Sequence, residues 1–343
     1  MNEQRVVATM IDKKLSTPAR PVSGATGAAR WPRWLSGYRT EIAIALAIVS
    51  LELLAGMIIP AALSWGNFAN VTQAAAPLII MSLGVLLVVI TGGIDLSVGS
   101  VFSLTGMVTG LAMAHGAGPL GSSLAGLSVG LVFGAFNGAL VTLAGLAPFV
   151  VTLISYAIAG SLAFIVTDGH SMPIPDTDYW QLNGGSLVPG ILNHVLFCLL
   201  LLVLIEFGLK KVVAGRWLFA AGSSSQAAAL LGIPVRSVQF SAYLASALLA
   251  SFAGLLSVSY ISNAEATAGA PLMLQAIAAV VIGGASLSGG TGSAVGALLG
   301  ALMITVIQNS VNLIGVNSFW QGTVTGMVIL AAALIDRISK TRR

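Results

Sequence analysis

The sequence predicts an all-α polytopic membrane protein with about ten transmembrane helices. Of its 343 residues, 57% are hydrophobic and only 8% are charged, whereas roughly a quarter are charged in ordinary soluble domains. This composition excludes a soluble and a disordered chain. The apolar runs are continuous rather than alternating, which excludes a transmembrane β-barrel. At ~20 residues per crossing, the ~300 residues after a polar N-terminal stretch accommodate about ten crossings.

The distribution of basic residues predicts the orientation of the chain. All fifteen Lys and Arg residues lie in three clusters, which fall before residue 40, within 210–236 and after residue 336. Because cytoplasmic flanks of membrane spans collect Lys and Arg, we expect all three clusters and both termini in the cytoplasm. Each stretch between clusters must then cross the membrane an even number of times. No cluster is expected to present interleaved aromatic residues on a folded face, so the clusters favour contact with anionic membrane lipid over nucleic-acid binding.

The polar ends of the chain are expected to lie outside the membrane. Residues 1–40 are basic and rich in Pro, Ser, Thr and Ala, and no apolar signal-peptide segment precedes Glu41. We therefore expect a disordered cytoplasmic tail over 1–40, a single transmembrane domain over 41–336 and a short cytoplasmic tail over 337–343.

An acidic segment over 167–189 contains no basic residue and is expected to be extracytoplasmic. It carries Asp168, Asp176 and Asp178, and Glu265 falls in a second turn of the same kind. Because basic residues mark the cytoplasmic side of a membrane protein, their absence indicates the opposite side.

Each predicted span is an apolar run bounded by polar, proline-containing or glycine-rich turns. The spans cover 41–63, 73–91, 97–115, 120–145, 148–166, 190–209, 238–261, 273–286, 292–309 and 318–335. Six crossings precede the basic segment 210–236 and four follow it, which satisfies both parity conditions. Spans eight and nine are short and rich in glycine, so a re-entrant pair there would satisfy the same parity.

Glycines recur at four-residue spacing in the fourth span, at Gly126, Gly130, Gly134 and Gly138. Small residues on one helix face let two backbones approach closely in lipid, where burying apolar side chains contributes little. This spacing predicts a closely packed helix pair.

The first motif, Thr91–Ser100, breaks two apolar spans with glycines and places Asp95 inside the hydrophobic region or at its edge. A carboxylate at that depth costs several kcal/mol unless it is paired or hydrated. Irregular backbone is tolerated there only within protein or beside a water-filled cavity. Asp95 is interpreted as the N-cap of the third span, as part of a break lining a transport path or gate, or as both. The candidate path residues here are Gly92, Gly93, Asp95 and Ser97.

The second motif, Gly283–Gly290, repeats the pattern Gly-Gly-x-x-Leu-Ser-x-Gly of the first. Ser286 takes the place of Asp95, and Val-Val-Ile precedes both copies. The repetition favours an internal structural repeat with the transport path between the two halves, as in many transporters. Coincidence in a chain rich in Gly, Ser and Val is the alternative. The candidate path residues of this copy are Gly283, Gly284 and Ser286.

The third motif lies in the basic segment 210–236. Gly222 and Ser223–Ser225 offer a turn and an N-cap, Gln226–Leu231 can form a short helix, and Gly232 with Pro234 ends it. A short, largely uncharged helix on the cytoplasmic side fits either docking into a groove on a partner or lying on the bilayer. The candidate docking residues are Gly222, Ser223, Ser224, Ser225, Gln226, Leu230, Leu231, Gly232 and Pro234.

Several chemical signatures are missing from the sequence. It contains no Gly-x-x-x-x-Gly-Lys-Ser/Thr motif for ATP phosphates, no metal-binding cluster and no catalytic triad signature. We therefore expect a transporter subunit that is not an enzyme and binds no metal or cofactor itself. Energy must come from another chain or from an ion gradient, for which Asp95 and Glu52 are the clear core candidates.

Further motifs give the chain a recognisable family likeness. Gly92–Ser100 resembles the signature of monosaccharide permeases of bacterial ABC importers, particularly the ribose type, within the branched-chain amino acid and sugar permease family. The likeness covers about 40–336 in one consistent order. It continues through Asn137–Val141, Pro148–Leu153, Leu231–Ile233, Ala276–Gly284, Gly289–Gly290 and Asn312–Asn317.

The resemblance implies a fold, partners and a location. The fold would be that of the larger-permease importers typified by the vitamin B12 importer. The partners would be a second permease copy, P-loop ATPase subunits that carry ATP and Mg, and a periplasmic sugar-binding protein. The Gly222–Gly232 segment would be the coupling helix seated in the ATPase. The permease would lie in the bacterial cytoplasmic (inner) membrane. The residues assigned to binding-protein docking are Asp168, Asp176, Asp178 and Glu265.

Two departures from the family pattern stand beside this likeness. Met273 and Gln275 occupy positions that are commonly acidic, which removes a charge from the outer gate or docking surface. Ser225 and Ala229 replace the Glu and Arg often found in the coupling segment, which predicts a less charged ATPase contact. The expected substrate is a monosaccharide or related polyol, with a ribose-like sugar first. The alternative function is a self-sufficient ion-coupled secondary carrier, which would not need the cytoplasmic segment.

Overall fold

The computed structural model describes residues 38–174 and 177–317, with Trp320, Gly322, Thr323, Gly326, Met327 and Leu330. The described residues from Thr40 onward belong to one compact unit. Nearly all of the expected tail 1–40, all of the tail 337–343 and most of the tenth span 318–335 lie outside the described residues.

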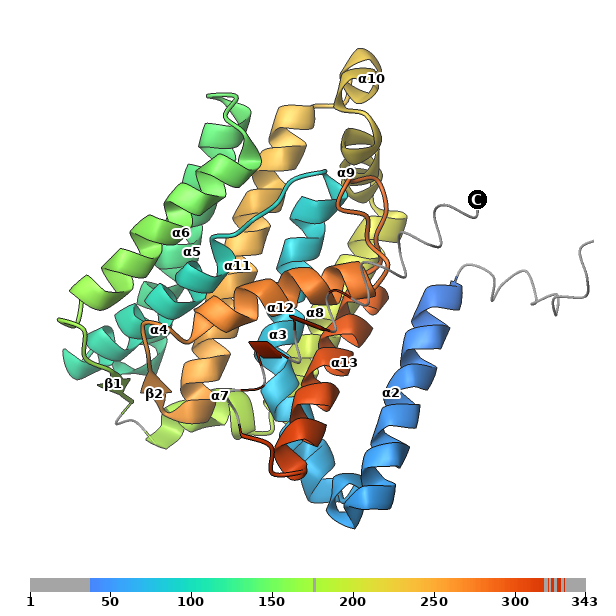
Figure 1. The fold of residues 1–343 in the computed structure, drawn as a ribbon. Coiled ribbons are helices and arrows are strands. Elements are labelled where there is room, and N and C mark those ends of the chain that lie inside the picture. Colours follow the sequence, from blue (N-terminus) through green and yellow to red (C-terminus); the bar gives the residue numbers. More distant parts are fainter. Residues whose placement is uncertain are drawn as a thin grey trace, which may run out of the picture. The chain divides into compact units, whose positions relative to one another are not determined.

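Each of the first nine predicted spans corresponds to a helix (Figure 1). These helices are α2 (Arg39–Ile58), α3 (Trp65–Ile90), α4 (Val98–Ala114), α5 (Gly118–Thr142), α6 (Pro148–Ile165), α8 (Asn193–Lys211), α11 (Val235–Ile261), α12 (Gly269–Ile282) and α13 (Ala294–Leu313). The shorter elements are η2 (Pro60–Leu63), η3 (Thr177–Trp180), α7 (Gln181–Gly184), α9 (Val213–Ser223) and α10 (Ser225–Leu230). Two strands, β1 (Met172–Pro173) and β2 (Asn263–Ala264), pair antiparallel.

Within the described residues, seven helices are long and apolar enough to cross a membrane. Two further apolar helices are shorter: α4 has 17 residues and α12 has 14. At 1.5 Å per residue α12 extends only ~21 Å, less than the ~30 Å of a hydrocarbon core. The prediction of an all-α polytopic membrane protein is confirmed, whereas the number of ten crossings stays a prediction.

Helix α3 forms the centre of the bundle. In its most hydrophobic stretch 83% of the residues are buried, against 17% in α2. It packs against α8, α11, α12 and α13, and Figure 1 shows it among them. A helix that is apolar on all sides belongs inside a protein, so the sequence of α3 suits its place.

The glycine stripe on α5 packs against α11, as its spacing predicts. A Cβ at Gly130 would lie 2.6 Å from the carbonyl oxygen of Ala247, and a Cβ at Gly134 would lie 2.9 Å from the Cα of Leu244. Neither position has room for a side chain. This close backbone contact aligns the two helices on either side of the first motif.

The beginnings of the two short helices meet. A Cβ at Gly99 of α4 would lie 2.6 Å from the carbonyl oxygen of Gly269, where α12 starts. The backbone N–H of Gly269 donates a hydrogen bond to Ser103 Oγ on α4, at 2.9 Å. Helices α4 and α12, which are far apart in the sequence, therefore begin side by side.

Candidate translocation site

The first motif forms a non-helical link between α3 and α4, visible in Figure 1 as an extended segment. Helix α3 ends at Ile90, and Gly92 turns the chain with a φ of +81°. This left-handed conformation favours glycine. A Cβ at Gly93 would overlap the hydroxyl oxygen of Tyr243, so the second glycine admits a neighbouring helix.

Asp95 is fully buried in this link. One carboxylate oxygen accepts hydrogen bonds from the backbone N–H of Ser97 at 3.0 Å and from its hydroxyl at 2.6 Å. The other accepts from the hydroxyl of Ser246 on α11, at 2.9 Å. The N-cap residue of α4 is Ser97, two residues after the expected Asp95, and Asp95 holds the turn before the helix. Hydrogen bonds rather than a cation thus surround this carboxylate among the described residues.

A chain of buried hydrogen bonds continues from this turn into α5 and α6. The side-chain amide of Asn137 donates to Ser97 Oγ at 2.8 Å, and the hydroxyl of Ser155 donates to Asn137 Oδ1. The next residue, Tyr156, accepts a bond on its carbonyl from Ser100 Oγ at 2.8 Å. The network therefore joins the first break to three helices and returns to α4. Polar groups buried in this way fix the relative positions of the segments that carry them.

The second motif has local geometry like that of the first. Helix α12 ends at Ile282, and Gly284 turns the chain with a φ of +89°. The hydroxyl of Ser286 accepts a hydrogen bond from the N–H of Ser288 at 3.3 Å, two residues on. Asp95 makes the same two-residue contact in the first motif. The left-handed glycine stands one position later in the second copy of the pattern, and the matching contact of Ser286 supports the interpretation as an internal repeat.

The three motifs meet at one point, which we call the glycine junction (Gly92, Gly222, Gly289 and Gly290). The N–H of Gly290 donates to the carbonyl oxygen of Ile90 at 2.9 Å. A Cβ at Gly222 would overlap that same carbonyl oxygen, and a Cβ at Gly289 would lie 2.8 Å from the carbonyl oxygen of Gly222 and 2.9 Å from the nitrogen of Gly92. The basic segment 210–236 therefore touches both helix breaks through backbone atoms.

The position of Gly222 corrects the sequence interpretation. Gly222 and Ser223 were expected in a turn before the short helix, but they form the last residues of α9. The hydroxyl of Ser223 donates to the carbonyl of Phe219 at 2.8 Å, within the same helix. Local sequence does not show that the end of α9 is packed against α3, and this packing keeps the residues helical.

The short helix α10 (Ser225–Leu230) forms as the capping pattern predicts. The hydroxyl of Ser224 accepts a hydrogen bond at 3.3 Å from the N–H three residues on. Gly232, with a φ of +79°, ends the helix, and the N–H of Ile233 donates to the carbonyl of Ala228 at 3.1 Å. This is the hydrogen bond of a Schellman motif.

The apolar tip of α10 is uncovered. Leu230 is 90% exposed and Leu231 is 82% exposed, whereas Ala228 is buried. Gln226 is also exposed. Adjacent exposed leucines on a rigid, capped helix form a surface suited to an apolar groove on a partner.

Glu206 on α8 makes contacts with two different helices. It pairs with Lys210 one turn away on α8. Its second carboxylate oxygen accepts a hydrogen bond at 3.0 Å from the N–H of Ala294, the first residue of α13. An acidic side chain stabilises the N-terminus of a helix. Glu206 therefore holds the helix that follows the second break.

The acidic residues of the expected outer surface lie in two connected turns. Pairing of β1 with β2 brings the segment after Asp168 beside the turn that contains Glu265. Asp178 and Glu265 are exposed, and Asp176 lies outside the described residues. Asp178 accepts a hydrogen bond from the side-chain amide of Gln181 at 3.2 Å, and Glu265 accepts one from that of Asn263 at 3.3 Å.

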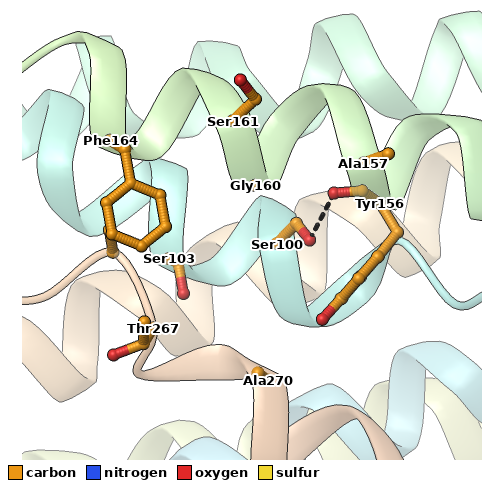
Figure 2. A pocket seen from close by; sticks show the side chains of 10 residues that line it. Ser100, Ser103, Tyr156, Ala157, Gly160, Ser161, Phe164, Thr267 and Ala270 are labelled. Carbon is orange, nitrogen blue, oxygen red and sulfur yellow. Dashed lines mark hydrogen bonds between the residues drawn. The ribbon is translucent and has the colours of Figure 1, made fainter. Parts of the chain in front are cut away.

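A pocket of about 300 Å³ opens beside the meeting point of α4 and α12 (Figure 2). Its walls come from α4, from α6 and from the segment that begins α12. The residues lining it are Ser100, Ser103, Tyr156, Ala157, Gly160, Ser161, Phe164, Ala266, Thr267 and Ala270. The sequence analysis did not identify these residues, because hydroxyl side chains are scattered through the spans and only the packing brings these together.

The profile of one protein family, described as branched-chain amino acid transport system / permease component, matches residues 67–333. That range contains both helix breaks and the α9–α10 segment. The chain belongs to this permease family. The resemblance stated from the motifs is thereby confirmed, and the protein is a multi-pass membrane protein of a transport family.

Curated relatives of the permease cover nearly its whole length. The probable ABC transporter permease protein y4mJ of Sinorhizobium fredii is 70% identical over 336 residues, 98% of each chain. The ribose import permease protein RbsC of Bacillus subtilis is 35% identical over 293 residues, 85% of this chain and 91% of the relative. The D-allose transport system permease protein AlsC of Escherichia coli is 32% identical over 277 residues, 80% and 85% of the two chains.

These names place the permease among the permeases of sugar ABC importers. No solved structure matches the chain. The likeness to the vitamin B12 importer fold therefore stays an expectation from the motifs.

Proposed function

We propose that this protein is the transmembrane subunit of an ABC importer that carries a monosaccharide or related polyol inward across the bacterial cytoplasmic membrane. A ribose-like sugar is the first candidate substrate, since relatives are named for ribose and for allose. The observation that carries the proposal is the capped helix α10, whose exposed leucines lie one short segment away from the glycine junction.

In this proposal α10 is the coupling helix. A separate ATPase subunit binds ATP and Mg and moves α10 when it closes. Because α9 meets α3 and the second break with backbone atoms in direct contact, a movement of α9 displaces both. The ends of α3 and α12 then shift together with α9. The Asp95 network transmits the shift of the first break to α5, α6 and α11.

The proposed assembly contains further partners. A second copy of this chain would complete the path, which suits the largely exposed, apolar α2 and α6 as lipid-facing or subunit-facing helices. A periplasmic sugar-binding protein would dock at the end of the bundle that carries Asp178 and Glu265.

An ion-coupled carrier is the second candidate function. It is favoured by the complete burial of Asp95, since carriers place ionisable groups in the membrane core. A carrier, however, has no use for an exposed apolar helix joined to both breaks.

Purification of the tagged protein from its native membrane in mild detergent tests the proposal. We expect a stoichiometric ATPase with a Walker motif among partners identified by mass spectrometry, and ATP-dependent sugar uptake after reconstitution. A homogeneous preparation without an ATPase, which transports under an ion gradient, would contradict the proposal in favour of the carrier.

A further inference from the structure

We propose that the pocket between α4, α6 and the start of α12 is a binding site for the transported polyol within the permease. The inference rests on the proposed function and adds to it the residues that contact the substrate. Tyr156 and Phe164 on α6 and Ser103 on α4 are the principal side chains.

The location of the pocket is the first argument. It opens to the surface of the chain along α6, a helix long and apolar enough to cross a membrane, with Ser161 and Thr267 exposed at its edge. Lipid tails cannot hydrogen-bond to hydroxyl groups, and polar groups in a membrane protein face the protein interior or a water-filled cavity. This face is therefore expected to line an aqueous path rather than to meet lipid.

The chemistry of the lining is the second argument. None of the lining residues is charged, and five of them carry hydroxyl groups. A zwitterionic amino acid would need partners for a carboxylate and an ammonium group, because desolvating either charge is costly. Hydroxyls can both donate and accept, which matches the hydroxyls of a neutral polyol. The pocket thus favours the sugar substrates of the family over its amino acid substrates.

The two aromatic rings set the shape of the pocket. Figure 2 shows Phe164 and Tyr156 at opposite ends, with Ser100 and Ser103 between them. The rings stand eight residues apart on α6, which corresponds to ~12 Å along a helix. Apolar faces at both ends and hydroxyls between them complement the C–H faces and the hydroxyl rim of a sugar ring. A volume of about 300 Å³ lies at the lower end of the range for ligand sites and suits a single ring.

Ser103 is placed to bind a ligand hydroxyl. It is 3% exposed, and its oxygen accepts the hydrogen bond from the N–H of Gly269. Among the described residues its own hydrogen has no acceptor, and it lies at the pocket wall. A buried donor without an acceptor is costly, and a polyol oxygen would satisfy it.

The pocket is also connected to the cytoplasmic side of the molecule. Its Tyr156 directly follows Ser155, where the hydrogen-bond chain from Asp95 ends, and the carbonyl of Tyr156 accepts a hydrogen bond from Ser100. A shift of the first break, driven from the glycine junction, would therefore change the spacing of α4 and α6 around the ligand. This gives a direct physical route from α10 to substrate affinity.

Cysteine accessibility tests whether the pocket is aqueous and occupied by sugar. The native chain has a single cysteine, Cys198, which is buried, so background labelling is low. S161C and T267C place a thiol at the pocket, and I158C places one on an exposed position of α6 outside it. The complete importer in proteoliposomes is labelled with a charged methanethiosulfonate in the presence of D-ribose, D-allose or L-leucine.

We expect S161C and T267C to react at least ~10-fold faster than I158C, and the transported sugar, but not L-leucine, to slow the reaction several-fold. Equal slow labelling of all three variants would show that the pocket faces lipid and would overturn the inference. Fast labelling that the transported sugar leaves unchanged would overturn it as well. Wild-type uptake, measured alongside, separates this result from failure of the proposed function, which would show as no ATP-dependent uptake of any sugar.

Y156F provides a second test that preserves packing. It removes one hydroxyl and keeps the ring, so loss of one ligand hydrogen bond should raise KM for uptake by about fivefold. Y260F is the matched control, since Tyr260 is exposed on α11 and does not line the pocket. An unchanged KM in Y156F together with unprotected S161C would refute contact with the sugar.

Discussion

The leucine tip of α10 provides the sharpest prediction, because its side chains contact almost nothing in the isolated chain. Leu230 and Leu231 are 90% and 82% exposed. L230A/L231A should therefore leave the folded permease unchanged and weaken only its binding to the ATPase subunit. Both alanines also favour a helix, so α10 itself should persist.

The expected loss follows from the apolar surface removed. Each Leu→Ala change deletes three carbon atoms, worth ~0.8 kcal/mol each when buried. Scaled by the exposed fractions, the double variant loses about 4 kcal/mol of binding free energy if docking covers both side chains fully. It loses about 2 kcal/mol if docking covers half of their exposed surface. These values correspond to losses in affinity of about 700-fold and about 30-fold.

The assay is titration of the purified ATPase subunit onto permease in nanodiscs, with uptake in proteoliposomes as the functional readout. L53A/L54A is the matched control, since Leu53 and Leu54 are 51% and 58% exposed on α2, away from α10. Wild-type ATPase affinity and uptake in L230A/L231A would refute the reasoning that this helix carries the docking energy.

Three further predictions concern the interior. Gly222→Ala should abolish uptake and lower the amount of folded protein, because its Cβ would overlap backbone atoms. The matched variant Gly232→Ala faces open space and costs only ~1–2 kcal/mol of left-handed strain. Size-exclusion yield should separate the two variants, and equal yields would contradict the packing. Asp95→Ala should reduce uptake and yield far more than Glu265→Ala, because it leaves three buried hydrogen-bond donors without their acceptor, at ~1–3 kcal/mol each. Wild-type uptake and yield in Asp95→Ala would mean that the motif is a tolerated break. Glu206→Ala should lower the midpoint of thermal unfolding by a few degrees, because ~1 kcal/mol of stabilisation is lost at the start of α13. Glu206→Gln should be intermediate. An unchanged midpoint would show that the contact contributes nothing to stability.

Most of the local structure could be predicted from the sequence. Hydropathy located nine helices to within a few residues at most ends, with α3 the main exception because it begins at Trp65, eight residues before the predicted span. Polar residues such as Asn67 and Asn70 conceal this start. Ser64, which caps the helix through the N–H of Asn67 at 3.1 Å, is the signal that would have located it.

Only part of the candidate site could be predicted from the sequence. The sequence marked the two glycine breaks and the caps of α10, because a left-handed glycine and an N-cap serine act on backbone groups only a few residues away. It did not show that Gly222 ends α9, nor that Glu206 reaches α13. Both contacts join residues far apart in the chain.

Sequence alone determined that this chain spans a membrane and where its helices break, since hydropathy and local hydrogen bonding need no knowledge of neighbours. Its family was recognised from the resemblance of its motifs to those of known permeases. The tertiary structure alone decided which breaks meet. Backbone contact at Gly222 and Gly289, the donors around Asp95 and the pocket beside Tyr156 all depend on helices brought together from distant parts of the chain. In lipid, close packing of small residues selects those neighbours, and single-sequence periodicity does not encode the pairing.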